Sequence, residues 1–149
     1  MNHFSTFKGT VWPVFFTLLF LLPVSCKKEE QAPEIPYVYV HFSLNPNGTM
    51  YQELNAVNGS VTVTGGYNGI LIFRVSFNEF MAFERACPYE PLTKGAQVRV
   101  EQQGLSYCFC PVCGSKYIMT YGTPFEGPSP YPLKQYRTFY DGAMLYVTN

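Results

Sequence analysis

The sequence predicts an all-β domain, built as a sandwich or a partly closed barrel of antiparallel sheets. Short stretches rich in β-branched and aromatic residues recur along the chain, separated by Asn-Gly and Asp-Gly pairs that favour tight turns. Charged residues make up only 13% of the chain, whereas Gly and Pro number 12 each, Tyr 12 and Phe 13. Because the chain also lacks an amphipathic helix of useful length, this composition indicates a β fold with many turns.

The first half of the domain contains four predicted strands. Residues 37–42 are β-branched and aromatic, and residues 61–64 alternate between apolar and polar side chains. Residues 70–75 form a nearly continuous apolar run, which predicts a strand buried on both faces. Residues 80–85 form a further strand that leads directly into Cys87.

The next predicted strands surround a second group of cysteines. Residues 97–101 and 105–110 flank a Gln-Gln-Gly turn, so we expect them to form a hairpin. Residues 116–120 form a strand that leaves the second cysteine motif.

The last two predicted strands, residues 136–139 and 143–147, form a second hairpin. Between them lie Asp141 and Gly142, a pair that favours a type I′ turn. The whole pattern predicts eight to ten short strands with non-local pairing.

Residues 1–25 are predicted to be a lipoprotein signal peptide. After Lys8, residues 11–24 form an apolar run that is short for a transmembrane span but has the length of a signal-peptide core. Ser25 precedes Cys26, and a small residue followed by Cys at this point resembles a lipoprotein signal, in which Cys26 becomes the acylated first residue. The alternatives are an ordinary secretory signal and an uncleaved anchor helix.

Residues 26–36 are predicted to be the acylated Cys26 and a flexible tether, charged at first and then rich in proline. The Lys-Glu-Glu cluster after Cys26 also resembles the surface-export signal of Bacteroidetes lipoproteins, although a solvated tether explains it equally well. A lipid anchor makes the membrane an expected partner. The expected location is therefore the cell envelope, anchored to the outer membrane on its periplasmic or surface-exposed face.

Residues 37–149 remain as one domain, in which seven Lys and Arg balance seven Asp and Glu. No basic stripe interleaves with the aromatic residues, which argues against nucleic acid as a partner. The sequence also lacks a Ser-His-Asp set, a carboxylate pair, a phosphate-binding loop and a dinucleotide-binding motif. We therefore do not expect an enzyme, but at most an electron-transfer component.

Two short cysteine motifs lie near the middle of the chain. They are Cys87-Pro88-Tyr89 and Cys110-Pro111-Val112-Cys113-Gly114-Ser115. Together they resemble the two ligand loops of Rieske iron–sulfur domains, C-x-H and C-P-x-H-G-S, and the resemblance runs from about Gly69 to the C-terminus. In that family a Gly/Pro segment, matched here by residues 127–133, packs against the cluster. The resemblance implies a Rieske-like fold with a small two-loop cysteine subdomain.

The ligand set departs from the family pattern. A Rieske centre binds one iron through two cysteines and the other through two histidines. The resemblance assigns Cys87 and Cys110 to the cysteine positions, but Tyr89 and Cys113 stand at the histidine positions. His41 is the single histidine of residues 37–149, so two imidazole ligands from this domain are excluded.

Three fates of the cysteines remain open. In the first, Cys87, Cys110 and Cys113 hold iron, zinc or an altered 2Fe–2S centre, with Cys108 or Tyr89 as the fourth donor. In the second, the cysteines form disulfides in an oxidising compartment and there is no cofactor. In the third, they take part in thiol–disulfide exchange.

Two residues of the second motif are expected to support the site. Gly114 can adopt the positive φ of a tight knuckle. The resemblance implies that Ser115 donates a hydrogen bond to a bridging sulfide.

The expected function depends on which fate holds. With iron and sulfide bound, the domain would transfer single electrons to an unknown protein partner. With disulfides, it would be a non-redox surface binding or structural domain, and with zinc, a metal-stabilised domain.

Overall fold

The computed structural model describes Met1 and residues 32–149, and residues Gln31–Asn149 form one compact unit. The predicted signal peptide, Cys26 and the first part of the predicted tether lie outside the described residues. In the described part of the chain, no helix is both long and apolar enough to cross a membrane.

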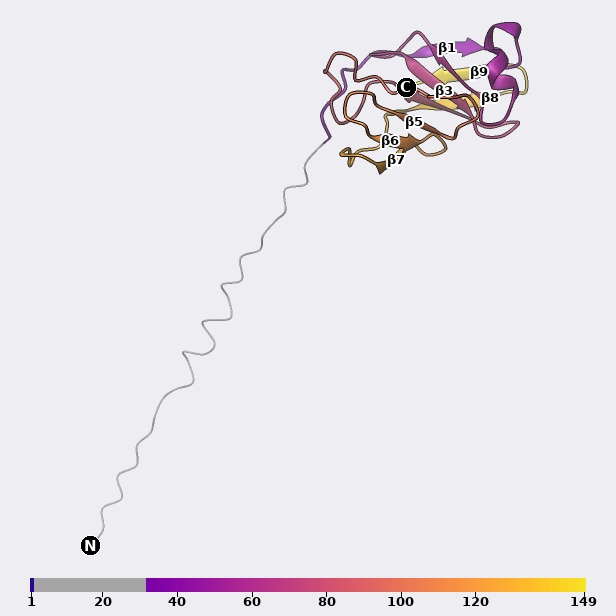
Figure 1. Ribbon diagram of the computed structural model, residues 1–149. Coiled ribbons are helices and arrows are strands. Elements are labelled where there is room, and N and C mark those ends of the chain that lie inside the picture. Colours follow the sequence, from indigo (N-terminus) through magenta and orange to yellow (C-terminus); the bar gives the residue numbers. More distant parts are fainter. Residues whose placement is uncertain (2–31) are drawn as a thin grey trace. The chain divides into compact units, whose positions relative to one another are not determined.

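The described unit consists of two antiparallel sheets and one short 3₁₀ helix (Figure 1). The elements are β1 (His41–Leu44), η2 (Thr49–Asn55), β2 (Ser60–Val63), β3 (Ile70–Arg74), β4 (Phe80–Glu84), β5 (Tyr107–Phe109), β6 (Lys116–Ile118), β7 (Thr123–Glu126), β8 (Gln135–Tyr140) and β9 (Leu145–Thr148). Six strands form one sheet in the order β1-β9-β8-β4-β3-β2, and β5, β6 and β7 form the other. The prediction of an all-β fold with antiparallel sheets is confirmed.

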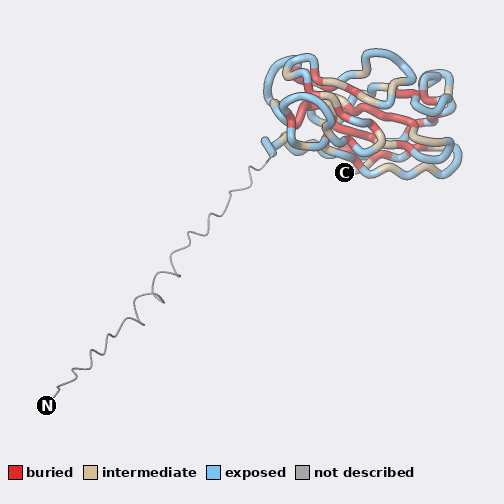
Figure 2. The backbone as a smooth tube through the Cα atoms, turned by 60° about the horizontal axis from the view of Figure 1, so that its bottom comes forward, coloured by how far each residue is buried: buried red, intermediate tan, exposed pale blue. Residues whose placement is uncertain are grey.

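Strand β3 lies at the centre of the packing, as its apolar run predicts. All five of its residues are buried, and Figure 2 shows buried residues along the strands and exposed residues in the loops. Its last residue, Arg74, is also buried, and its guanidinium donates hydrogen bonds to the carbonyl oxygens of Leu54 (2.7 Å) and Phe77 (2.6 Å). A buried cation is tolerated here because these acceptors replace water.

Two hydrophobic clusters pack on opposite faces of the large sheet. The cluster shared with the small sheet includes Leu71, Phe83, Val98, Cys108, Tyr117 and Leu133. The other includes Leu44, Leu54, Ile70, Ile72, Tyr136 and Val147. The small sheet is therefore held to the large one by the cluster that contains the buried cysteines.

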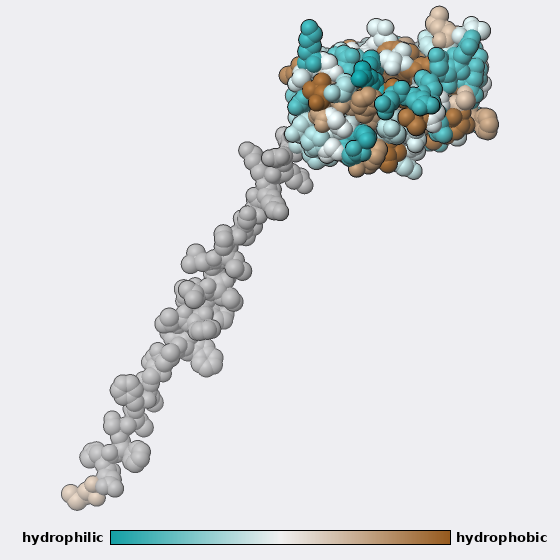
Figure 3. All heavy atoms as spheres, in the orientation of Figure 1, coloured by the Kyte–Doolittle hydropathy of each residue, from teal (hydrophilic) through white to brown (hydrophobic). Residues whose placement is uncertain are grey.

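On the face of the molecule seen in Figure 3, hydrophobic residues lie in separate patches among hydrophilic ones.

Residues 97–101 do not form the predicted strand, although they do pair with β5. Arg99 exchanges two 2.9 Å backbone hydrogen bonds with Phe109, while on the other side Cys87 N–H donates to Ala96 O at 2.9 Å. Val98 N–H donates to Arg85 O at 2.7 Å. This segment alternates between two partners, so it joins the loop before Cys87 to the strand before Cys110.

Strand β7 was not predicted because it contains Pro124, which lacks a backbone N–H. The strand lies at the edge of the small sheet, where a proline is tolerated.

The type I′ turn predicted at Asp141-Gly142 is wrong. A type I′ turn needs positive φ at both central residues, but Gly142 has φ +98° and Asn58 is the single described non-glycine residue with positive φ. Tyr140 pairs with Leu145, and the Asp141 carboxylate accepts hydrogen bonds from the N–H groups of Ala143 (2.9 Å) and Met144 (2.7 Å). The aspartate side chain organises this turn in place of the expected backbone geometry.

Candidate metal centre

Three cysteine sulfurs converge where the two cysteine loops meet. Cys87 follows β4 and Cys110 follows β5, whereas Cys113 lies in the turn before β6. Their sulfur atoms all lie within 4.8 Å of one another, and those of Cys87 and Cys113 are 3.6 Å apart. Cys87 and Cys110 are buried, and Cys113 is partly exposed. The structure thus brings together three of the five residues predicted as candidate ligands.

The second loop is folded as a tight knuckle around Cys110. Cys110 N–H donates to Ser115 O and Gly114 N–H donates to Cys110 O, both at 2.9 Å. Gly114 has φ +77°, a value that strains residues with a Cβ. The backbone N–H groups of Val112 and Cys113 are directed at the Cys110 sulfur. Such N–H groups stabilise a thiolate in a turn of this kind.

Ser115 connects this knuckle to the Gly/Pro segment. Its buried hydroxyl oxygen accepts a hydrogen bond from Ser129 N–H at 3.0 Å and lies 3.2 Å from the Cys113 sulfur. Gly127 lies so close that a Cβ there would be 2.5 Å from Ser115 Cα. The Gly/Pro segment therefore packs directly against the second cysteine loop.

Gly127→Ala is expected to destabilise the domain by about 2–4 kcal/mol, because it combines a positive φ with a steric overlap. Gly127 has φ +95°, and the overlap is with the buried backbone of Ser115. Urea unfolding of the metal-free protein measures the change. Gly104→Ala is the matched control, since Gly104 has φ +86° but a Cβ added there would meet no atom within 4 Å. The control should lose only about 1 kcal/mol, and equal losses in both variants would contradict the packing argument.

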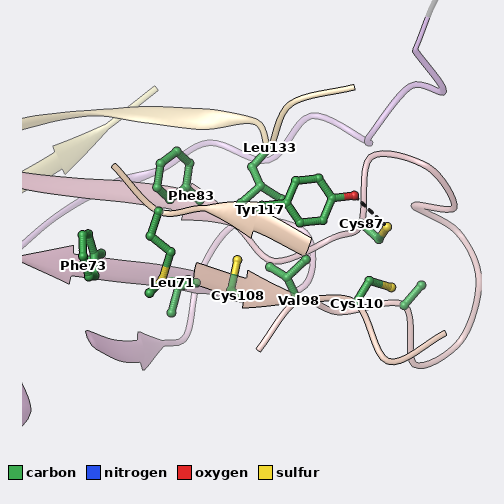
Figure 4. Packing of buried hydrophobic residues seen from close by; sticks show 11 residues of the cluster. Leu71, Phe73, Phe83, Cys87, Val98, Cys108, Cys110, Tyr117 and Leu133 are labelled. Atoms are coloured by element: carbon green, nitrogen blue, oxygen red, sulfur yellow. Dashed lines mark hydrogen bonds between the residues drawn. The ribbon is translucent and has the colours of Figure 1, made fainter. Parts of the chain in front are cut away.

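Tyr117 is a site residue that the sequence alone does not distinguish from a packing residue. It is fully buried on β6, and its hydroxyl lies 3.5 Å from the Cys87 sulfur (Figure 4). Burial, together with the neighbouring Cys87 thiol, raises the pKa of this phenol. Tyr117 therefore stays protonated and presents a hydroxyl group to the site. Its place two residues after Ser115 was the available signal.

Cys108 and Tyr89, the two residues considered as a fourth donor, are placed differently. Cys108 is paired with Tyr117 across β5 and β6, lies in the core cluster, and is not one of the three convergent cysteines. Burial raises the pKa of the Cys108 thiol to about 12, as expected for an unreactive core residue. The Tyr89 side chain is 37% exposed at the surface.

Cys110 and Cys113, two of the three convergent thiols, differ in acidity. Burial raises the pKa of Cys110 to about 12. Burial acts in the same direction on Cys113, but hydrogen bonds with the Ser115 hydroxyl and backbone, and with the Cys87 and Cys110 thiols, lower its pKa overall. Cys113 therefore ionises more readily than Cys110 in the metal-free protein.

In metal-free protein, Cys113 is expected to react with iodoacetamide about tenfold faster than Cys108 or Cys110. Its thiolate forms at lower pH than that of an ordinary thiol with a pKa of 9.0, so its reaction rate should rise with pH before that value is reached. Mass spectrometry of peptides after short labelling identifies the modified residue. Unfolding in urea is the control, because it should make all cysteines react alike. Preferential labelling of Cys108 in the folded protein would contradict this assignment.

The four cysteines of the described chain are free thiols. A disulfide requires sulfur atoms about 2.05 Å apart, whereas the Cys87 and Cys113 sulfurs are separated by 3.6 Å. No pair of the described cysteines therefore lies at disulfide distance.

Glu84 positions the first cysteine loop from inside the protein, although a charged residue at a strand end is usually solvated. It is fully buried, and its carboxylate accepts hydrogen bonds from Tyr67 N–H (2.6 Å), Asn68 N–H (2.9 Å), Ala86 N–H (3.0 Å) and the Tyr136 hydroxyl (2.8 Å). Ala86 directly precedes Cys87, so this network fixes the backbone that carries the first thiol.

Comparison with known proteins gives distant structural resemblances. No protein-family model matches the chain, and no curated protein matches it in sequence. The fold is similar to the ferredoxin of carbazole 1,9a-dioxygenase from Nocardioides aromaticivorans IC177, with 16% identity, a TM-score of 0.44, and coverage of 62% of this chain and 86% of that one. It is also similar to a chain in the complex of reduced oxygenase and oxidized ferredoxin in carbazole 1,9a-dioxygenase, with 22% identity, a TM-score of 0.45, and coverage of 62% and 82%.

Proposed function

We propose that this protein is an exported, lipid-anchored, Rieske-like domain that binds a metal centre through Cys87, Cys110 and Cys113. With iron and sulfide bound, its function is one-electron transfer to a protein partner. The observation that carries the proposal is the convergence of three sulfur atoms within 4.8 Å. The ferredoxins of the two similar structures agree with this function but do not carry it.

The donor set fits a thiolate-ligated metal and does not fit the usual Rieske centre. His41 lies on β1, where it is exposed and stacks on Tyr39 at a ring-centroid distance of 6.3 Å. The group of possible ligands found among the described residues contains three cysteines and no histidine. Sulfur atoms bound tetrahedrally at about 2.3 Å to one metal ion lie about 3.8 Å apart, close to the 3.6 Å between Cys87 and Cys113. Thiolate sites of this kind suit iron or zinc.

Each cysteine would contribute to the centre in its own environment. Cys110 would bind as a thiolate that receives the backbone N–H groups of the knuckle. The Tyr117 hydroxyl lies beside Cys87, and the Ser115 hydroxyl beside Cys113. These groups stabilise negative charge on the sulfurs and exclude water from the buried side. An iron–sulfur group held there supplies one-electron transfer, and the partly exposed Cys113 marks the side nearest to a partner.

The decisive test is analysis of the fragment that begins at Gln31, produced in iron-replete reducing conditions and, separately, in oxidising conditions. We expect iron and sulfide in stoichiometric amounts, a visible absorption spectrum, and a paramagnetic signal after one-electron reduction. One zinc ion per chain without iron would leave the metal site but contradict electron transfer. Colourless protein without metal or free thiols under both conditions would overturn the metal centre in favour of the disulfide alternative.

The anchoring part of the proposal is tested separately. It rests on the apolar run of residues 11–24 and on Cys26, followed by a short tether to the domain. Residues 1–25 would be removed and acyl chains attached to Cys26 would hold the protein at the outer membrane. Cys26→Ala should block processing and release the protein from washed membranes. Unchanged processing and attachment in this variant would contradict lipidation.

A further inference from the structure

One face of the large sheet carries an exposed row of aromatic side chains. Strands β1, β9 and β8 are neighbours in this sheet (Figure 1), and Ser43 pairs with Tyr146, which pairs with Phe139. Residues that pair across neighbouring strands project to the same face. Phe139 is 65% exposed, and its ring lies 6.0 Å from the ring of Tyr146.

The face continues through the segment that leads into β1. His41 pairs with Thr148, which pairs with Arg137, and the Tyr39 ring stacks on His41. Tyr39 is 73% exposed and Tyr37 is 71% exposed. We call Tyr37, Tyr39, His41, Phe139 and Tyr146 the aromatic face. The residues between them, such as Val40 and Val147, are buried in the core, so the sheet cannot turn these rings inward.

Cationic groups lie beside the aromatic rings. Arg137 projects from the same face of β8 as Phe139. Lys134 Nζ is 5.7 Å from the centre of the Tyr37 ring and 6.0 Å from that of the buried Tyr136, so it lies at the edge of the face, beside Tyr37. Two acidic groups border the face. The Asp141 carboxylate is occupied by the turn N–H groups and lies 3.2 Å from the Tyr146 hydroxyl, while Glu79 lines a groove with Arg137. Arg137 thus projects from the face itself, whereas Lys134 and the two acids lie at its border.

The chain reaches the aromatic face directly from its N-terminal segment. Ala32, Pro33 and Ile35 line a groove together with Pro88 and Lys134, and Tyr37 follows two residues later. Cys26 precedes Tyr37 by 11 residues, which span at most about 40 Å when fully extended. A lipid on Cys26 would therefore keep this face within a short distance of the bilayer.

We propose that the aromatic face rests on the headgroup region of the bilayer that holds the anchor. Tyrosine is enriched at this depth because its ring is apolar and its hydroxyl is polar, and Lys and Arg attract anionic lipid phosphates. This inference rests on the proposed lipid anchoring and is independent of the metal centre. The proposed occupant is the lipid surface itself, because the 11 residues between Cys26 and Tyr37 keep the aromatic face within reach of the bilayer.

The test uses the fragment from Gln31 onward, a compact unit that contains both hydrophobic clusters. The fragment is sedimented with vesicles of phosphatidylglycerol and phosphatidylcholine. We expect it to bind, and we expect Phe139→Ser combined with Tyr146→Ser to reduce binding at least fivefold. The matched control is Phe125→Ser combined with Tyr107→Ser, since these two rings also pack together, at 5.9 Å, but in the small sheet. Circular dichroism checks that both variants fold.

Two outcomes would overturn the inference. One is a fragment that does not sediment with vesicles, or that loses binding equally in both double variants. The other is a dimer in gel filtration that dissociates only in the Phe139/Tyr146 variant, which would assign the face to a second copy of the chain. Because lipidation is read from Cys26→Ala in cells, either outcome can occur while the anchor itself is verified.

Discussion

Cys110→Ser is expected to weaken metal binding by more than a hundredfold. Loss of an outer-shell partner alone typically weakens a site 10–100-fold, and here a ligand is removed. Cys110 is fully buried at the centre of the knuckle, and Cys108 does not lie among the convergent sulfurs to replace it. Metal content after reconstitution and competition with a chelator measures the loss.

Cys108→Ala is the matched control for this experiment. Cys108 is also a fully buried cysteine and lies only two residues away, but it packs in the core opposite Tyr117. This variant should keep one centre per chain and lose a modest amount of stability, since alanine fills less of the core. Equal metal loss from Cys110→Ser and Cys108→Ala would show that metal binding depends on the packing of the core. It would contradict binding through three specific thiolates.

Glu84→Ala is expected to lower the free energy of unfolding by about 4 kcal/mol. The change leaves four donors without their acceptor. The two buried ones, Ala86 N–H and the Tyr136 hydroxyl, each cost about 1–3 kcal/mol when unsatisfied, whereas water can reach the partly buried N–H groups of Tyr67 and Asn68. Because three of these donors are backbone N–H groups, of Tyr67, Asn68 and Ala86, the loop before β3 and the start of the first cysteine loop should both loosen. Urea unfolding monitored by circular dichroism gives the value.

Two milder variants separate the contributions of this network. Tyr136→Phe removes one donor and keeps the ring, so it should lose only about 1 kcal/mol. Glu84→Gln keeps one acceptor oxygen and should fall between the other two. A loss of less than about 1 kcal/mol for Glu84→Ala would show that water replaces the carboxylate fully.

The sequence predicted the parts of the fold in which one physical pattern dominates. The apolar run at β3 and the alternating residues of β2 appear as strands with boundaries shifted by one residue. Residues 97–101 were misjudged because their backbone pairs alternately with two partners, which no local pattern reveals. The turn at Asp141 was misjudged because its side chain replaces backbone geometry.

The candidate site was predictable in outline only. Motif resemblance located Cys87, Cys110 and Cys113, but residue type cannot distinguish a packed tyrosine from one whose hydroxyl faces a sulfur, as Tyr117 does. The buried role of Glu84 could not be predicted for a related reason. A carboxylate at a strand end is buried only if groups that are distant in the sequence, such as the Tyr136 hydroxyl, donate hydrogen bonds to it.

The unequal burial of the three thiols has a consequence for assembly. Cys87 and Cys110 are buried, so a metal ion that reached the folded domain would meet Cys113 first. Delivery and removal of the proposed metal would then begin and end at this one sulfur. Cys113 would set the rate at which the folded domain gains or loses the metal.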